Sequence, residues 1–425
     1  MKKIQFRRRD FFQNAAIVLL FLLAVALFTQ TQLYSLEAGA GYLDSLLEGD
    51  ASQNTSAPSE ILAGFAAPVR TAVTGVYGGR YGSTAMTTAD EEFEPLGSLL
   101  QETLGSAQAP EPCAVQDFLQ ALNSSSVVYY DFLNPLPLSI VAGLTAASWD
   151  GDSPTVRQLA VAAGADGAVS LYLWDGGEFC CRAASAVSAG ELARIVNRYE
   201  FNGAMFAFDS EALFSLAPCS LLPAEPPELP SLTSAVSLPG TETLLSSLGF
   251  YPRTNSRYPE PDGTEVITEG NRILRVSADG TVRYRGGGEN VITVSAAGES
   301  PTAAEAAAGV WTLLNNLLTP YAGEARLYLQ SVRQTEASTS LVFGYQIGGV
   351  PIRSATGAAA AQATLSGVAV TTLTLRFRQY SSAGEAAPML PLRQALGIAA
   401  AGNGGELSIG YADSGGAASA QWLVD

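Results

Sequence analysis

The chain has 425 residues, enough for two to three domains, and it carries a net charge of −17 with no histidine. Without histidine, the chain cannot supply Ser-His-Asp or Cys-His catalysis, or a histidine metal site. Beyond the first ten residues, 18 basic residues stand against 39 acidic ones, which gives a net charge of −21. Because nucleic-acid binding relies on Lys and Arg to neutralise phosphates, this balance predicts no nucleic-acid partner.

The N-terminal segment predicts a membrane anchor. Five Lys and Arg residues among the first nine precede an uninterrupted apolar run, Ala15 to Phe28, and the next basic residue is Arg70. A charge asymmetry this steep keeps the N-terminus in the cytoplasm and places the following chain across the membrane. We therefore expect a single-pass protein of the cell membrane, with a cytoplasmic tail at 1–10, a transmembrane helix at 11–34 and an extracytoplasmic remainder.

The residues that flank the apolar run must complete the span, because the run is shorter than the roughly 20 residues that cross a bilayer. Polar flanking residues are candidates for contact with transmembrane helices of a partner, since interhelical hydrogen bonds join helices in lipid; ordinary interfacial solvation is the alternative. These candidates are Gln13, Asn14, Thr29, Gln30, Thr31 and Gln32. A cleaved signal peptide is a second interpretation of the segment, with Ala38-Gly39-Ala40 as its best cleavage site.

Composition divides the rest of the chain into four parts. Residues 35–60 are mostly polar and rich in Ser, Gly and Ala, which predicts a juxtamembrane linker. Residues 61–220 and 241–425 predict a first and a second extracytoplasmic α+β domain. The stretch between them, 221–240, contains five prolines, and this composition predicts a semi-rigid spacer.

Short apolar runs separated by glycine-containing turns predict a strand-rich first domain. A capping box at Ser188 and Glu191 begins a helix whose apolar face includes Leu192 and Tyr199. The other expected elements are the strands Val69–Val76, Arg80–Met86, Val127–Phe132, Val156–Ala162, Ala168–Leu173 and Phe179–Ala183, and the helices Leu96–Leu104 and Val115–Leu122.

The second domain repeats this pattern of strands and short helices. Leu373, Leu375 and Phe377 alternate with polar residues, as in a half-buried antiparallel strand. The expected strands are Val266–Thr268, Arg272–Val276, Thr281–Arg285, Arg326–Val332, Ser340–Ile347, Thr364–Tyr380 and two short strands at the end; the expected helices are Glu242–Leu248, one after Pro301 with Val310, Leu313, Leu314, Leu317 and Leu318 on one face, and Pro391–Ala400. The chain is therefore predicted to be α+β, with helices packed on antiparallel sheets behind a single N-terminal transmembrane helix.

No motif in the sequence carries the chemistry of an enzyme. Gly78–Thr84 is glycine-rich but lacks the lysine of a phosphate-binding loop, so it predicts a tight hairpin. Calcium-loop and zinc-ligand spacings are missing as well, and we expect no catalytic residue, no cofactor and no metal. The four cysteines are either buried free thiols or include one disulfide that involves Cys113 or Cys219. They are Cys113, Cys180, Cys181 and Cys219.

Several blocks, in order along the chain, resemble the YycH/YycI family. The most specific block starts at Leu248 and continues into the hairpin around Arg272–Tyr284. Its matching residues are Gly249, Pro252, Thr254, Asn255, Arg257, Tyr258, Asp262 and Gly263. A second block, Phe343–Ile352, is similar to the family's strand pair through Tyr345, Gly349 and Pro351. Gly79–Gly82 and Leu96–Ala107 are similar to clostridial members.

The resemblance implies a regulator and brings no catalytic residue with it. Members of the family are extracytoplasmic accessory proteins of the WalK/WalR (YycG/YycF) two-component system of Gram-positive bacteria. The resemblance therefore implies a non-enzymatic, membrane-anchored regulator of a WalK-type sensor histidine kinase that controls cell-wall metabolism. It implies association with the kinase through the transmembrane helix and the outer domains, and a second YycH/YycI-like protein as a further partner.

Two other interpretations of the chain stay open. The first is an extracytoplasmic envelope-binding or assembly module, which grips a wall polymer or a protease through Arg253, Arg257 and Tyr258. The second is a carboxylate-based wall hydrolase, although carboxylate pairs without a supporting motif look the same as surface charge.

Overall fold

The structure is a computed structural model, and it describes residues 64–424 apart from 109, 144–153, 252, 289–290, 295–297, 299, 387 and 402–403. The described residues all belong to one compact unit, Ser56–Asp425. The predicted α+β class is confirmed, because antiparallel sheets dominate and the helices are few and short. The cytoplasmic tail, the anchor and the juxtamembrane linker predicted within 1–60 lie outside the described residues.

The first sheet has seven strands, in the order β2-β1-β4-β5-β6-β7-β3, and every neighbouring pair is antiparallel. The strands are β1 (Arg70–Thr74), β2 (Arg80–Ser83), β3 (Glu111–Pro112), β4 (Val127–Pro137), β5 (Thr155–Ala163), β6 (Val169–Trp174) and β7 (Cys180–Ala184). Gly167 closes the turn between β5 and β6 with φ +81°, a conformation that glycine adopts without strain. The predicted meander forms three consecutive strands of this sheet, β5, β6 and β7.

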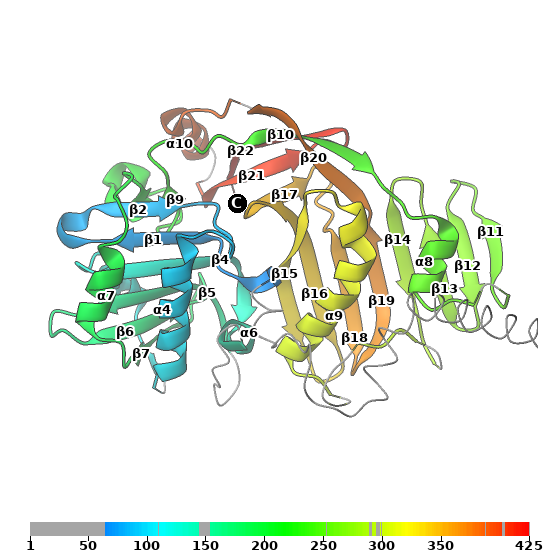
Figure 1. Ribbon diagram of the computed structural model, residues 1–425, viewed down its shortest axis with the longest axis horizontal. Helices are drawn as coiled ribbons and strands as arrows, with labels where there is room; N and C mark the ends of the chain where they lie inside the picture. Colours follow the sequence, from blue (N-terminus) through cyan, green and yellow to red (C-terminus); the bar gives the residue numbers. More distant parts are fainter. Residues whose placement is uncertain are drawn as a thin grey trace, which may run out of the picture. The chain divides into compact units, whose positions relative to one another are not determined.

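Helices cover both faces of the seven-stranded sheet. On one face Tyr130 of β4 donates a hydrogen bond of 2.8 Å to the carbonyl of Leu96, and α4 and α7 lie across this face (Figure 1). On the other face Tyr129 packs in a second apolar cluster with Phe118 of α5. β4 is therefore buried on both sides. The short helices of this region are η1 (Val76–Gly78), α4 (Phe93–Ser106), α5 (Val115–Ala121), α6 (Leu138–Gly143), α7 (Ala189–Val196), η2 (Ala207–Asp209) and η3 (Glu211–Leu213).

The second sheet has thirteen strands, in the order β11-β12-β13-β14-β19-β18-β16-β17-β21-β22-β10-β20, with β15 paired to β16. Its strands are β10 (Pro230–Val236), β11 (Ser256–Pro259), β12 (Glu265–Glu269), β13 (Arg272–Val276), β14 (Thr281–Arg285), β15 (Arg326–Gln334), β16 (Thr339–Ile347), β17 (Val350–Ser354), β18 (Ala361–Ser366), β19 (Ala369–Arg376), β20 (Arg378–Ala386), β21 (Leu407–Asp413) and β22 (Ala417–Val424). A separate small pair joins β8 (Met205–Phe206) to β9 (Leu221–Leu222).

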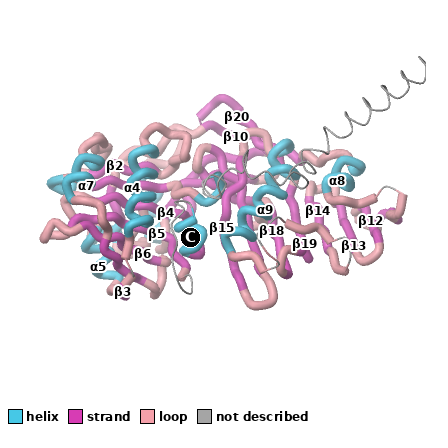
Figure 2. Tube along the Cα trace, turned by 60° about the horizontal axis from the view of Figure 1, so that its bottom comes forward, coloured by secondary structure: helices cyan, strands magenta, loops and turns pink. Residues whose placement is uncertain are grey.

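Two helices of the second region lie over one side of its sheet, with α8 near β13 and β14 and α9 near β16 and β18 in both views (Figures 1 and 2). α10 instead packs with Leu216 and Leu407 in a separate apolar cluster. α9 begins with a capping box, because the Thr302 hydroxyl accepts from the amide of Glu305 at 3.2 Å and Glu305 accepts from the amide of Thr302 at 2.9 Å. Of its predicted apolar face, only Leu313 is not fully buried. The helices are α8 (Thr241–Ser247), α9 (Ala303–Leu318), η4 (Thr319–Tyr321) and α10 (Leu392–Ala401).

Two sequence-based expectations differ from the observed elements. The single long strand expected at Thr364–Tyr380 is divided between β18, β19 and β20. The chain reverses between β18 and β19 at Gly367 with φ +57°, and β20 pairs with β10, whereas β19 pairs with β14. The expected spacer at 221–240 contains β9 and β10, and β10 pairs with both β20 and β22. Pro230 is compatible with this pairing because it is the first residue of its strand.

The two sheets share one hydrophobic core. Phe65, which precedes β1, stacks on Trp311 of α9 with ring centroids 5.4 Å apart, and it lies 5.8 Å from the Phe343 ring of β16. All three side chains therefore pack between elements that are far apart in the sequence. The two regions predicted from composition are joined by side-chain packing.

Candidate functional site

The six polar residues proposed to flank a transmembrane helix, Gln13, Asn14, Thr29, Gln30, Thr31 and Gln32, lie outside the described residues. Among the helices that the structure does describe, none combines the length and the apolar character that a membrane span needs.

The first family-like block folds at the turn between α8 and β11. Gly249 ends α8 with φ +68° and its carbonyl accepts a 3.0 Å hydrogen bond from Arg272. The same guanidinium lies 4.4 Å from the centroid of the Phe250 ring and pairs with Glu269. These contacts attach the start of the block firmly to β12 and β13.

Most polar residues of this block hold its own loop. Asn255 donates to the carbonyl of Tyr251 at 2.7 Å and accepts from Arg257 at 3.0 Å. Glu269 accepts hydrogen bonds from the hydroxyl of Thr254 and the amide of Tyr251. Burial would raise the pKa of Glu269, but these bonds and Arg272 lower it below its ordinary value. The carboxylate is therefore charged and fixes the loop.

The remaining residues of the block include a turn and an exposed aromatic ring. Asp262 accepts from the amide of Thr264 at 2.9 Å, which lowers the pKa of Asp262 and shapes the turn completed by Gly263 at φ +85°. Tyr258 on β11 is 49% exposed and Tyr251 is 63% exposed. Pro252 lies outside the described residues. The block therefore presents two aromatic side chains at the surface.

The second family-like block forms the β16–β17 hairpin, which faces the first sheet. Gly349 has φ +76°, and a Cβ atom there would lie 2.9 Å from the backbone of Met86, so only glycine allows this close approach. Tyr345 is buried and donates a 2.8 Å hydrogen bond to the carbonyl of Arg376, and burial raises its pKa. Pro351 is buried in β17.

A cavity of about 530 Å³ lies beside this hairpin, between β15–β17 and the ends of β1, β4 and β5. Val342 and Gly344 line it, while Leu341 and Phe343, which alternate with them, are fully buried, and Phe343 packs toward α9 through Phe65. The cavity is therefore on the side of β16 opposite α9. Its polar lining consists of Arg70, Asn134, Arg157, Tyr328, Gln330, Ser331, Tyr345, Arg353, Ser354, Arg376, Tyr380 and Glu406.

A buried ion network forms the wall of the cavity at the first sheet. Asp131 on β4 lies between Arg157, at 3.1 and 3.2 Å, and Arg70, at 3.3 Å. Glu406, just before β21, pairs with both arginines and lies 2.6 Å from Arg157. The network therefore binds three strands of the first sheet to the second sheet, and its four formal charges cancel.

Attraction between the opposite charges of the network offsets the cost of removing them from water. Burial would raise the pKa of Asp131, but Arg157 and Arg70 lower it below the ordinary value. Burial would likewise lower the pKa of Arg157, but Asp131 and Glu406 raise it. Asp131 and Arg157 are therefore charged at neutral pH.

The sequence alone did not predict the network or the cavity. Arg157 and Glu406 are 249 residues apart, and Arg70 and Glu406 are 336 residues apart. A charged residue inside the run Val127–Phe132 was the one available signal, because a charge in a fully buried strand needs a partner. The sequence therefore indicates that Asp131 needs an ion-pair partner, but it does not identify which residues pair with it.

Of the cysteines, Cys113 and Cys180 lie together. Their Sγ atoms are 2.9 Å apart, and the amide of Cys113 donates to the carbonyl of Cys180 at 3.1 Å. Both are free thiols, as are Cys181 and Cys219. Burial raises the pKa of Cys180 and Cys181. Within the part of the chain that the structure describes, no three acidic or Cys side chains gather in a way that could hold a metal ion.

Comparison with known proteins adds no relative. No family model matches the chain, and no match was found among the curated proteins or among the solved structures. A function for the chain is therefore inferred from its sequence and from the geometry of its described residues.

Proposed function

We propose that the chain is a non-enzymatic, membrane-anchored regulator of a WalK-type sensor histidine kinase that controls cell-wall metabolism. The resemblance of its ordered blocks to the YycH/YycI family suggests this role. The observation that carries the proposal is the exposed edge strand β11, which one of these blocks builds.

β11 has the features of a strand that accepts another chain. It is the terminal strand of the sheet order, its residues Ser256–Pro259 are all exposed, and no strand of the described residues pairs with its outer side. Exposed edges of this kind bind partners by adding a strand. Tyr251 and Tyr258 add aromatic surface, which is enriched at protein interfaces.

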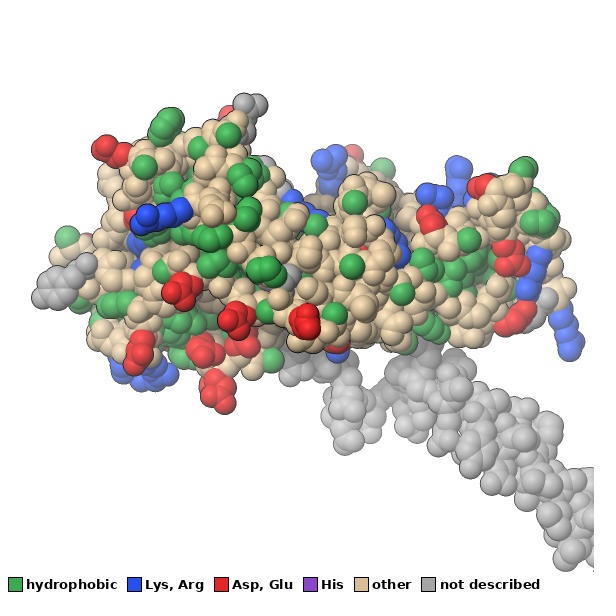
Figure 3. Space-filling view, turned by 90° about the horizontal axis from the view of Figure 1, so that it is seen from above, with side chains coloured by type: hydrophobic (Ala, Val, Ile, Leu, Met, Phe, Trp, Pro, Cys, Tyr) green, Lys and Arg blue, Asp and Glu red, His purple; other side chains and the backbone are tan. Residues whose placement is uncertain are grey.

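The edge is also held in place before a partner arrives. Glu269 and Arg272 attach the preceding loop to β12 and β13, so little conformational freedom remains to be lost on binding. Acidic and basic side chains are interspersed at this end of the molecule (Figure 3), which suits a protein partner better than a uniformly charged polymer. We assign this edge to the outer domain of the kinase.

Regulation of this kind needs only a small energetic preference. If the chain binds one state of the kinase about 1–3 kcal/mol more tightly than the other, saturating binding shifts the equilibrium constant between the two states by roughly 5–150-fold. No catalytic group is needed for such a shift.

The test is co-purification of the full-length chain with a WalK-type kinase in detergent, together with an assay of kinase autophosphorylation. We expect the variant Tyr251→Ala/Tyr258→Ala to lose most of the bound kinase. Phe214→Ala is the matched control, because Phe214 is 89% exposed but belongs to the first region. Equal capture of the kinase by the wild type and the edge variant would remove β11 from the proposal, and no capture by the wild type would overturn the role itself.

The transmembrane part of the proposal has its own test. We expect replacement of residues 11–34 by an unrelated anchor to reduce the effect on autophosphorylation while the chain stays in the membrane. Unchanged regulation by the swapped chain would show that contact in the membrane is not needed. Co-expression with a second YycH/YycI-like protein tests whether that partner strengthens the complex.

The exposure of the same edge also favours an envelope-binding or assembly module. Arg253, Arg257 and Tyr258 are all exposed there, and Arg257 is held by Glu242 at 2.9 Å. Sedimentation of the chain with isolated peptidoglycan decides between this role and kinase binding. Lysis of embedded cell walls in a gel would instead point to the carboxylate-based wall hydrolase.

A further inference from the structure

Arginine is the most frequent charged residue at the cavity between the two sheets. Among the described residues that line it are four arginines and one carboxylate, Glu406, although the chain as a whole has a net charge of −17. Asp131 lies behind Arg70 and Arg157, so these two arginines are balanced within the ion network by Asp131 and Glu406. Arg376 also lines the cavity and is not part of this network.

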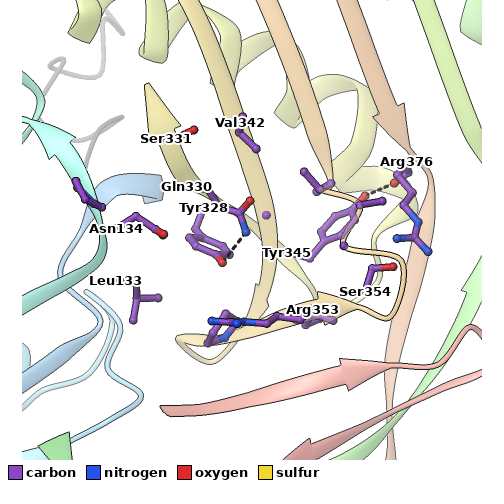
Figure 4. Close-up of a pocket in the computed structure, with 18 of the residues that line it drawn as sticks. Leu133, Asn134, Tyr328, Gln330, Ser331, Val342, Tyr345, Arg353, Ser354 and Arg376 are labelled. Atoms are coloured by element: carbon purple, nitrogen blue, oxygen red, sulfur yellow. Dashed lines mark hydrogen bonds between the residues drawn. The ribbon is translucent and has the colours of Figure 1, made fainter. Parts of the chain in front are cut away.

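Arg376 lines the cavity, and hydrogen bonds hold its backbone in place. Its carbonyl accepts from Tyr345 at 2.8 Å and its amide donates to the carbonyl of Ala360 at 2.9 Å. Among the described residues, no carboxylate lies within ion-pair distance of its guanidinium, and the residue is only partly exposed. In Figure 4 Arg376 and Ser354 line one side of the cavity, whereas Arg353 extends on the other side, below Tyr328.

The neighbouring polar side chains are arranged over a glycine. Gln330 donates a 2.8 Å hydrogen bond to the hydroxyl of Tyr328 (Figure 4), and both side chains lie against Gly344 of β16. A Cβ atom on Gly344 would lie 2.4 Å from Gln330 and 2.6 Å from Tyr328. Glycine therefore makes room for a hydroxyl and an amide at the cavity wall.

The opposite wall contains a strained residue. Leu133 has φ +68° and is the one non-glycine residue with positive φ among those that the structure describes. The bulge in β4 between Asp131 and Leu136 leaves it unpaired, and Asp131 accepts from its amide at 2.8 Å. Backbone strain that the surroundings enforce is concentrated at binding sites. The ion network thus holds an apolar side chain at the cavity in a costly conformation.

We propose that this cavity binds a small organic anion. A carboxylate or phosphate group would pair with Arg376, because a guanidinium group binds both in a planar, hydrogen-bonded way. An apolar part would lie against Leu133, Val342 and Ile352, which share the lining. The volume of about 530 Å³ lies in the range of small-molecule sites. This ligand site is independent of the proposed contact with a kinase.

Titration calorimetry on the full-length chain in detergent tests the proposal with three probes at matched ionic strength: benzoate, phenyl phosphate and inorganic phosphate. We expect saturable binding of benzoate or phenyl phosphate, and the comparison of these two identifies the preferred acid group. Inorganic phosphate should bind more weakly than phenyl phosphate, because it lacks the apolar part. Saturable binding by none of the three probes overturns the proposal.

Variants locate the binding. We expect Arg376→Gln to weaken binding roughly tenfold, the usual scale for a hydrogen bond to a charged group. Arg283→Gln, at an exposed position of β14 away from the cavity, is the matched control and should leave Kd unchanged. Ala358→Trp fills the cavity from an exposed position and should abolish binding even if the arginine variant folds poorly. Unchanged binding in both Arg376→Gln and Ala358→Trp contradicts the assignment.

Discussion

The seven-stranded sheet and the β11–β14 end of the thirteen-stranded sheet are built from similar strands but differ in how they are covered. β4 is buried along Val127–Phe132 because helices pack on both of its faces. β14 alternates between buried and exposed residues, and β11 is exposed throughout. The charged residues of β1, β4 and β5 are few and all belong to the buried ion network. β11–β14 carry more charged residues, and among them Arg283 and Arg285 are exposed. Charged side chains are therefore largely buried in these three strands of the first sheet, whereas some of them reach solvent at the β11–β14 end.

Among the changes that test this contrast, removal of a buried charge should have the largest effect on the free energy of unfolding. We expect Asp131→Ala to lower the free energy of unfolding by about 3–5 kcal/mol, because two arginines then share a single carboxylate in a buried site. Glu260→Ala removes the partner of Arg275 at the open end, where both side chains are about one third exposed or more, and should cost less than about 1 kcal/mol. Urea denaturation of both variants measures the difference, and equal losses would refute it.

A covalent link at the edge of the first sheet should have the next largest effect. Oxidised glutathione is expected to accept two hydrogens from Cys113 and Cys180 and to leave a disulfide, with a mass decrease of about 2 Da. The closed loop should stabilise the fold by about 2–4 kcal/mol. The raised pKa of Cys180 makes this reaction slow at neutral pH.

Intact mass and urea denaturation follow this oxidation. Cys219→Ser should still form the link, because Cys219 is not part of the pair, whereas Cys180→Ser should not. A disulfide that involves Cys181 in place of Cys180 would contradict the geometry. The terminal strand β3 can thus be linked covalently to β7, whereas β11–β14 contain no cysteine.

Acid should weaken the junction of the two sheets. The pKa of Asp131 is lowered on folding, so its contribution to stability is complete above the pKa of the unfolded chain, about 4, and is lost as the pH falls through the lower folded value. We expect wild-type stability to decline below about pH 4 and Asp131→Asn to show a shallower decline. Stability measured from about pH 7 down to about pH 2.5 tests this, and identical slopes would exclude Asp131 as a cause.

The smallest effect is expected at the open edge. Tyr258→Ala should change the free energy of unfolding by no more than about 0.5 kcal/mol, because its side chain is half exposed and away from the core. Thermal unfolding measures this directly. A large loss of stability would mean that the ring supports the fold, and the edge would no longer be a free contact surface.

The sequence predicted individual strands better than it predicted the site. The alternation around Leu373 predicted a strand with one buried face, as β19 has. The strand at Val127–Phe132 was predicted as well, but its burial on both faces was not. The reversal at Gly367 was missed because strand-forming residues stand on both sides of a single Ser-Gly pair. β10 was missed because prolines dominate its neighbourhood, although Pro230 occupies a permitted position.

The cavity could not be predicted, because its lining is assembled from segments between Arg70 and Glu406. Periodicity reports which face of a strand is buried, but it does not report which distant strand meets that face. Gly344 and Leu133 illustrate the limit. Gly344 matters because the side chains of Gln330 and Tyr328 pack directly against it. Leu133 matters because its backbone has a positive φ. Residue type alone does not reveal either property.

The pairing of Arg70 and Arg157 with Glu406 also sets an order for folding. Glu406 is synthesised 336 residues after Arg70, so during translation the first sheet is complete in sequence long before its charges can be balanced. Contacts this distant slow folding and leave partly formed states exposed for longer. We therefore expect nascent chains that stop before Glu406 to stay open to proteases at the first sheet, even though every strand of that sheet has already been made.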